Sequence, residues 1–115
     1  PVAATTQMWV QSPRSAIDNL VIGHEVPASA FTYTRSVNVP GITVAVGDMV
    51  AALATVAGAD VAARVKWQFD PAIDRIVSTW PARFAPRFGE SLGMKGDSDF
   101  AGIVRAYMAD DMPRA

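Results

Sequence analysis

Two helix-start signals divide this chain, and each consists of a polar capping residue followed by proline. Ser12 precedes Pro13, and Asp70 precedes Pro71. The serine or aspartate side chain can accept a hydrogen bond from a backbone N–H of the first helical turn, which otherwise has no partner. Proline suits the first helical position, because its fixed φ is helical and its missing N–H is not needed there. The sequence therefore predicts one helix after each of these prolines.

Alternating side chains mark two candidate β-strands, at residues 33–39 and 63–69. The second is the clearer, because Val65, Trp67 and Phe69 would face one side of a sheet and the polar residues between them the other. Such strands are too few and too scattered to build a self-sufficient sheet. We therefore predict an α+β fold, a small helix-rich lobe with a few short strands that completes a larger body.

The other elements follow from apolar residues at helical spacing and from glycine and proline stops. Gly23, Gly58 and Gly93 are expected to end helices, Thr43 is the nearest candidate N-cap of the second helix, and Asp97–Asp99 caps the last. The predicted buried face of the first helix comprises Ala16, Ile17, Leu20 and Val21. Helices are expected near 13–22, 46–57, 71–79, 86–92 and from 100 onward, with further short strands at 7–10 and 42–44.

Composition narrows the classes of function. The chain has 115 residues, 50% of them hydrophobic, and 10 basic against 11 acidic residues give a net charge of −1. Without a basic excess, neither nucleic acid nor an anionic membrane is an expected partner. The absence of cysteine excludes disulfides, thiolate catalysis and cysteine-bound zinc. No apolar run approaches the roughly 20 residues of a membrane span, and we expect a cytoplasmic protein whose start at Pro1 suggests processing, truncation or a fragment.

Arg14 is the first candidate binding residue. It lies in the first turn of the first predicted helix, where backbone N–H groups and the positive helix end already favour an anion. The position suits a carboxylate or a phosphate. The alternative is an ordinary surface arginine that pairs with Asp18, four positions further along the helix.

The proline-flanked loop after residue 79 is a second candidate. Trp80, Arg83 and Phe84 would suit a flat or anionic ligand through packing and charge-assisted hydrogen bonds. The same residues would equally form a hydrophobic plug beneath the loop.

The remaining titratable groups have simpler interpretations. Asp70 and Asp74 could serve acid–base chemistry or hold a divalent metal, but a capping role explains Asp70 and a surface position explains Asp74. His24, the single histidine, follows the expected end of the first helix beside Glu25, where a surface role is sufficient. We predict no catalytic residue and no metal ligand on this chain.

Five motifs occur in the order expected for one protein family. They are Trp9–Ala16, Val37–Gly41, Val46–Leu53, Asp70–Val77, and Trp80–Pro81 followed by Ser91–Met94. Together they resemble the C-terminal lobe of an extended short-chain dehydrogenase/reductase of the NAD-dependent epimerase/dehydratase family. Within it, the similarity is greatest to a branch that oxidises small hydroxy acids such as D-erythronate. The resemblance covers residues 7–111.

The resemblance implies an NAD-binding Rossmann domain, a smaller substrate lobe and a substrate cleft between them. It implies a Ser/Tyr/Lys set beside the nicotinamide and, in this branch, oxidation of the carbon next to a carboxylate. The sequence departs from that pattern, because it contains neither the glycine-rich NAD turn nor a Tyr-x-x-x-Lys pair. Residues 1–115 would then be the substrate-binding lobe alone, a fragment of a larger enzyme, without its own cofactor and inactive by itself. A homodimeric parent enzyme is a further expectation, since the family often dimerises through Rossmann helices.

The resemblance also nominates substrate-binding residues: Ser12 and Arg14 at the start of the first helix, with Arg75 and Trp80 as further candidates. The expected ligand is a small hydroxy acid or a sugar derivative. One alternative is a lobe of a nucleotide-sugar epimerase or dehydratase, whose diphosphate would need two or more converging arginines. Another is a stand-alone, non-catalytic binding module.

Overall fold

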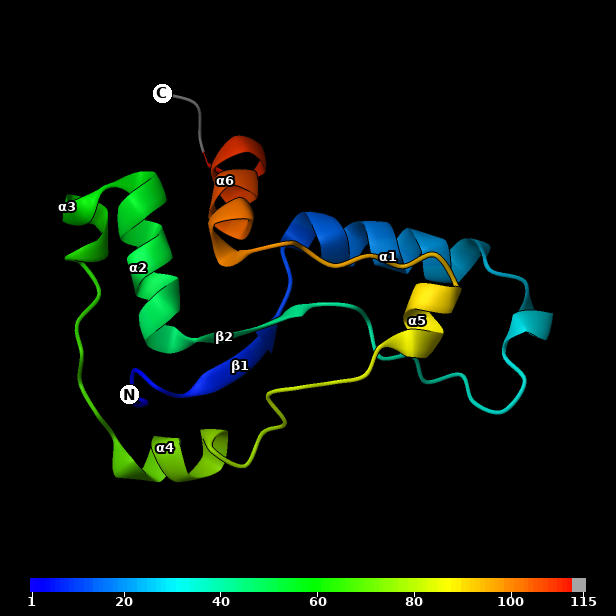
Figure 1. Ribbon diagram of the computed structural model, residues 1–115, viewed down its shortest axis with the longest axis horizontal. Coiled ribbons are helices and arrows are strands. Elements are labelled where there is room, and N and C mark those ends of the chain that lie inside the picture. The colour runs from blue at the N-terminus through cyan, green and yellow to red at the C-terminus, as the bar shows by residue number, and fades with distance from the viewer. Residues whose placement is uncertain (113–115) are drawn as a thin grey trace.

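The computed structural model describes residues 1–112 and shows a helix-rich lobe around one small sheet, as predicted (Figure 1). Among these residues the helices carry most of the regular structure, and the sheet has two strands. In chain order the elements are β1 (Gln7–Val10), α1 (Pro13–Glu25), the 3₁₀ helix η1 (Ala28–Ala30), β2 (Ile42–Ala45), α2 (Val46–Ala57), α3 (Ala59–Ala62), α4 (Pro71–Val77), α5 (Arg87–Ser91) and α6 (Phe100–Asp110).

The sheet is an antiparallel pair of β1 and β2, in which Trp9 lies opposite Thr43. The Trp9 ring fixes the surrounding loops: its Nε1 donates to the Val39 carbonyl at 3.3 Å, and it packs edge-on against Phe84 with the ring centroids 5.6 Å apart. Gly41 permits this contact, because a Cβ there would lie 2.8 Å from Trp9 Nε1. The indole therefore connects β1 to two segments that are distant in sequence.

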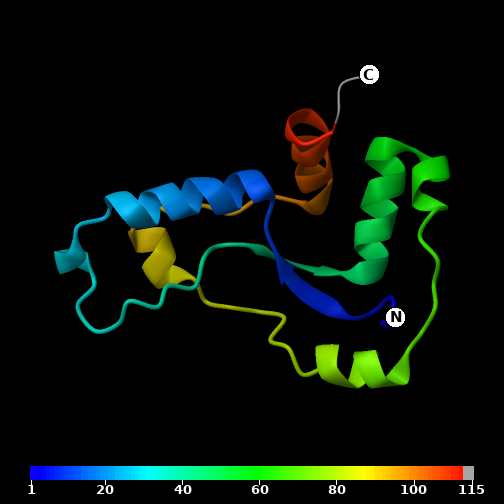
Figure 2. The ribbon, with the colours of Figure 1, turned by 180° about the vertical axis from the view of Figure 1, so that it is seen from behind.

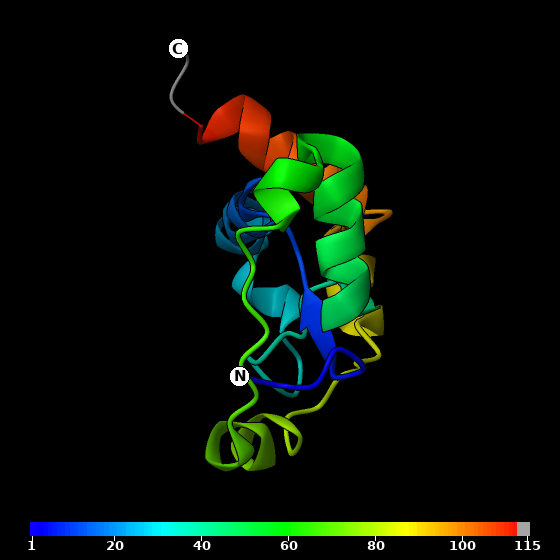
Figure 3. The ribbon, with the colours of Figure 1, turned by 90° about the vertical axis from the view of Figure 1, so that its left-hand side faces the viewer.

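The lobe is thin and its core is small. Its principal extents are 49 × 39 × 19 Å, and the edge-on view shows the narrow dimension (Figure 3). Within residues 1–112 the buried hydrophobic side chains are Met94, Ile103 and Val104, the last two on α6 where it packs against α2. No helix in the described part is long and apolar enough to cross a membrane.

The two strands predicted from side-chain alternation do not form. Residues 33–39 and 63–69 are irregular in structure. The second segment runs along the outer edge of the lobe between α3 and α4 (Figures 2 and 3), and Val65, Trp67 and Phe69 are exposed. An alternating sequence becomes a strand only where a neighbouring strand accepts and donates its backbone hydrogen bonds, and these segments have no such neighbour among the described residues.

The helix caps were predicted more accurately. Ser12, Asp70 and Asp99 each cap a helix by accepting a backbone N–H, and Gly58 and Gly93 end helices at φ of +98° and +91°. These φ values favour glycine, because other residues are strained there. α4 ends at Val77, two residues before the predicted end, where Ser78 takes up the C-cap position.

Two predicted caps are wrong. α1 continues through Gly23 to Glu25, and Gly23 lies inside the helix. The N-cap of α2 is Ala45 rather than Thr43, whose hydroxyl donates to the Ala82 carbonyl at 2.7 Å. The free N–H groups of α2 are instead satisfied by backbone: Val46 donates to the Thr6 carbonyl and Gly47 to that of Ala4. This solution depends on how the N-terminal segment folds back, which local sequence does not reveal.

Candidate functional site

Ser12 organises the start of α1 from a buried position. Only 1% of its surface is exposed. Its hydroxyl donates to Asp97 Oδ1 at 2.8 Å and accepts the Ser15 N–H at 3.0 Å, while its backbone N–H donates to Asp97 Oδ2 at 2.7 Å. The Ser15 hydroxyl adds a bond of 3.1 Å to the same carboxylate. The Asp97 carboxylate therefore fixes the first turn of α1, and the Ser12 hydroxyl is already occupied within the protein.

Arg14, in contrast, is exposed and forms a two-pronged ion pair. Its Nε and Nη2 each donate to a different oxygen of Asp110 at 2.8 Å. The hydrogen bonds and the positive charge of Arg14 lower the pKa of the Asp110 carboxyl below its usual value, and the same contact raises the pKa of Arg14. The partner is thus Asp110 at the end of α6, rather than Asp18 on the same helix. This geometry is the one in which arginine generally binds a carboxylate.

Trp80 lies in a different place, at the end of the α4 region. It is exposed and lines a cavity of about 260 Å³ together with Trp9, Val77 and Phe84. Arg75 is an exposed residue in the last turn of α4. The loop after residue 79 therefore offers an aromatic depression against β1, which fits both interpretations of the loop, ligand contact and hydrophobic packing.

The four nominated residues form two separate groups. Ser12 and Arg14 are at the start of α1, whereas Arg75 and Trp80 belong to α4 and its exit loop. The β1–β2 sheet lies between these regions (Figures 1 and 3). As substrate-binding residues all four remain predictions, and a ligand that bound all of them would have to reach across the sheet.

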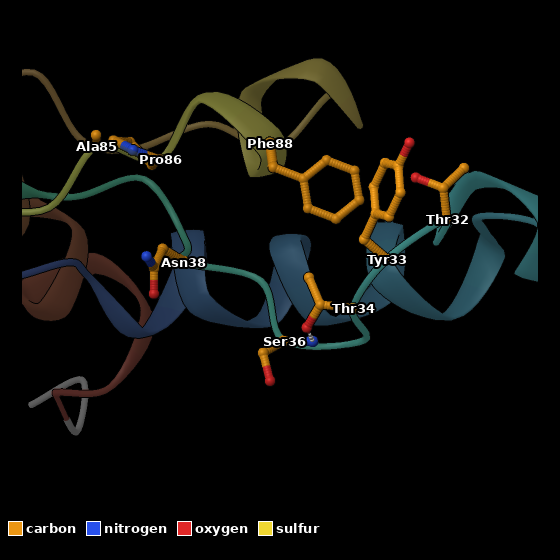
Figure 4. A pocket seen from close by; sticks show the side chains of 8 residues that line it. All are labelled: Thr32, Tyr33, Thr34, Ser36, Asn38, Ala85, Pro86 and Phe88. Carbon is orange, nitrogen blue, oxygen red and sulfur yellow. Dashed lines mark hydrogen bonds between the residues drawn. The ribbon is translucent and has the colours of Figure 1, made fainter.

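A second depression, which sequence reasoning missed, lies between the loop after η1 and the start of α5 (Figure 4). Its cavity of about 240 Å³ is lined by hydroxyl and amide side chains and by two aromatic rings, those of Tyr33 and Phe88. Tyr33 is 99% exposed, and in the figure its ring stands beside that of Phe88. Residues 33–39 were predicted to be a strand, and that pattern gave no signal for a cavity.

The other titratable candidates have structural roles. Asp70 accepts the N–H groups of Ala72 and Ile73 as the N-cap of α4, and Asp74 accepts the N–H of Ala3 at 3.3 Å. In residues 1–112 no group of three or more His, Asp or Glu side chains is arranged to hold a metal ion. The arrangement presents an exposed guanidinium at Arg14 and an aromatic depression at Trp80.

The chain is similar to part of two curated proteins. It is 41% identical over 110 residues to a D-erythronate dehydrogenase of Cupriavidus necator, a match that covers 96% of this chain and 34% of that protein. It is 30% identical over 112 residues to a D-erythronate dehydrogenase of Haemophilus influenzae, covering 97% and 36%. The chain thus spans about a third of the length of these relatives. No protein-family model matches it.

A solved structure has the same fold. The nucleoside-diphosphate-sugar epimerase from Agrobacterium tumefaciens matches with a TM-score of 0.88 and 28% sequence identity, over 96% of this chain and 32% of the epimerase chain. In the epimerase, as in the two dehydrogenases, the matching region is about one third of a longer polypeptide.

Proposed function

We propose that this chain, a relative of the D-erythronate dehydrogenases with the epimerase fold, is the substrate-binding C-terminal lobe of an NAD-dependent oxidoreductase acting on a small hydroxy acid. The observation that carries the proposal is the 41% identity to the Cupriavidus necator dehydrogenase over 96% of this chain. Residues 1–115 form the lobe, and the parent polypeptide contains the cofactor site and the acid–base group.

NAD does not fit the residues of this chain. The sequence has no glycine-rich strand–turn–helix and no Tyr-x-x-x-Lys pair. We therefore assign the cofactor to the rest of the parent enzyme and assign no chemical step to this lobe. Its contribution is to bind and orient the substrate.

Arg14 is the proposed carboxylate-binding residue. Its guanidinium is exposed and already binds one carboxylate, that of Asp110, through two hydrogen bonds. A substrate carboxylate would replace Asp110 in the same geometry, and Ser12 would support the exchange by fixing the helix turn from which Arg14 extends. Trp80 and Arg75 would contact other parts of the ligand in a larger cleft completed by the parent enzyme.

The test uses the full-length polypeptide that contains this sequence, with NAD and D-erythronate as substrates. Replacing Arg14 with alanine should lower kcat/KM. The activation free energy that kcat/KM reports should rise by about 1–3 kcal/mol, the usual effect of losing a charged hydrogen bond. Arg105→Ala is the matched control, because Arg105 is also exposed and also pairs with a carboxylate. Its partner is Asp99, 3.6 Å away, which is the N-cap of the same helix, α6. An unchanged kcat/KM in Arg14→Ala would remove Arg14 from the site.

The alternative substrate class is a nucleotide sugar, and the fold match to the epimerase favours it. A diphosphate would need more than one arginine in the same place. The two arginines that form ion pairs within residues 1–112, Arg14 and Arg105, each contact a carboxylate of the protein. Activity of the full-length polypeptide on nucleoside-diphosphate sugars, without activity on hydroxy acids, would decide for this alternative. A stand-alone binding module is the third possibility, and a reading frame that encodes only residues 1–115 would favour it.

A further inference from the structure

Helix α1 packs into the lobe through its polar side. Asn19 is 2% exposed, and its amide donates to the Lys95 carbonyl at 2.7 Å and accepts the Lys95 N–H at 2.9 Å. One turn away Gly23 lies against the Met94 methyl group, and at the start of the helix Ser12 bonds to Asp97. The segment from Met94 to Asp97 therefore runs along α1 and is held by hydrogen bonds (Figure 1).

The apolar side of the same helix faces outward. Ile17, Leu20 and Val21 are 60%, 73% and 56% exposed. Their spacing of three and four residues places them on one stripe of the helix surface. An amphipathic helix at the surface of a globular protein normally buries such a stripe and exposes its polar side. In α1 this arrangement is reversed.

We propose that the α1 stripe, defined as Ile17, Leu20 and Val21, is the surface on which the remaining two thirds of the parent polypeptide pack. This inference rests on the proposed function, because it requires a parent chain longer than residues 1–115. The two dehydrogenases and the epimerase each contain about twice as much additional chain as this lobe represents. A helix face that is apolar and outward-facing in the lobe alone becomes an ordinary buried face in such a polypeptide.

The covalently linked remainder suits this surface better than a second copy of the chain. A stable homodimer generally buries about 800 Å² on each partner, whereas the stripe consists of three side chains on one narrow helix. Contacts between domains of one chain need less area, since the covalent link keeps both surfaces at high effective concentration. The polar residues Asp18 and Glu25 lie along one edge of the stripe, beside Val21.

The experiment is carbene footprinting of the native full-length polypeptide, with modified residues located by mass spectrometry. The α1 stripe should be modified about fivefold less than in the denatured chain, as exposure falls from more than half to nearly complete burial. Asp18 and Glu25, on the polar flank of α1, serve as internal controls and should stay reactive. Equal modification of the stripe in the native and denatured states would overturn the inference.

Varying the protein concentration distinguishes packing of the stripe against the rest of the same polypeptide from packing against a second copy of the chain. If the stripe were protected only at concentrations where sedimentation shows a dimer, and became reactive on dilution to monomer, a second copy would be the occupant and the inference would fail. Dehydrogenase activity is measured on the same sample. An active enzyme with a reactive stripe refutes the interface alone, and a protected stripe in a polypeptide inactive on hydroxy acids refutes the proposed function alone.

A charge placed on the stripe provides an independent test. In the full-length polypeptide Leu20→Asp should lower the thermal midpoint, because it would bury a carboxylate without a partner. Leu20→Met should keep a midpoint close to that of the parent, and Asp18→Asn controls for the change of charge on the same helix. A full-length Leu20→Asp variant with an unchanged midpoint would contradict the interface.

Discussion

At the scale of single residues, Ser12 and Arg14 are two positions apart and have opposite environments. Ser12 is buried and its hydroxyl is committed to Asp97, whereas Arg14 is exposed and paired with Asp110. The first turn of α1 therefore combines a fixed anchor with an accessible cation. A ligand could displace Asp110 from Arg14 without disturbing the anchor.

The Arg14–Asp110 pair makes a prediction about pH. Hydrogen bonds from Arg14 lower the pKa of Asp110 in the folded chain. A carboxyl group whose folded pKa is below its unfolded value stabilises the fold above the unfolded pKa, and this contribution disappears as the pH falls through the folded pKa. In an NMR titration Asp110 should therefore titrate below the usual range for aspartate, and Arg14→Gln should return it to that range.

Asp18→Asn is the control for that titration, since Asp18 lies near Arg14 on the same helix but does not bond to it. It should leave the Asp110 titration nearly unchanged. The ion pair is not formed in solution if Asp110 titrates normally in the unmodified chain.

At the scale of elements, α1 shows that side-chain pattern and burial can disagree. The spacing of its apolar residues predicted the helix correctly, but Ile17, Leu20 and Val21, which were predicted to be buried, are exposed in this chain. Asn19 holds α1 to the segment 94–97, a contact between residues 76 positions apart in the sequence. That pairing decides which side of the helix is buried.

On α1, replacing a polar residue should therefore destabilise the fold more than replacing the apolar residue beside it, the reverse of what is usual for a helix. Asn19→Ala removes both hydrogen bonds to the Lys95 backbone and a longer one to Gln11, and it leaves the Lys95 groups unpaired. The substitution should therefore lower the free energy of unfolding by about 1–3 kcal/mol. Leu20→Ala, at an exposed position of the 115-residue chain, should stay within about 0.5 kcal/mol. Urea unfolding of the 115-residue variants measures both.

The opposite order, with Leu20→Ala the more damaging change in the 115-residue chain, would mean that the apolar side of α1 is buried there. The hydrogen bonds from Asn19 to Lys95 would then not define the packing of the helix.

At the scale of the whole molecule, hydrophobic content and burial do not match. Half of the residues are hydrophobic, yet only three hydrophobic side chains are buried within residues 1–112. The predicted resemblance to the extended short-chain dehydrogenases/reductases is confirmed, with relatives about three times as long as this chain. A lobe cut from such a polypeptide would have this surface.

The 115-residue chain alone should therefore be marginally stable and should bind the dye ANS, which reports accessible apolar surface. Its thermal transition should be broad and its midpoint low, because little apolar surface leaves water on folding. Fluorescence and circular dichroism measure the two properties. A monomer with a sharp, high-temperature transition and no ANS binding would contradict the expectation.

What the sequence determined by itself was local. The N-caps at Ser12, Asp70 and Asp99 and the glycine stops at Gly58 and Gly93 depend on residues adjacent in the chain. The family resemblance needed only the order of the motifs along the sequence. Capping and left-handed glycine conformations involve only a few neighbouring residues, so a local pattern is sufficient to predict them.

Tertiary structure decided the rest. Residues 63–69 have the side-chain pattern of a strand but no strand beside them, Arg14 pairs with a carboxylate 96 positions away, and Asn19 rather than Leu20 faces the lobe. Each outcome depends on which distant segment lies alongside. A sequence pattern specifies that a strand needs a partner or that a helix has an apolar side, and only the assembled chain determines what that partner is.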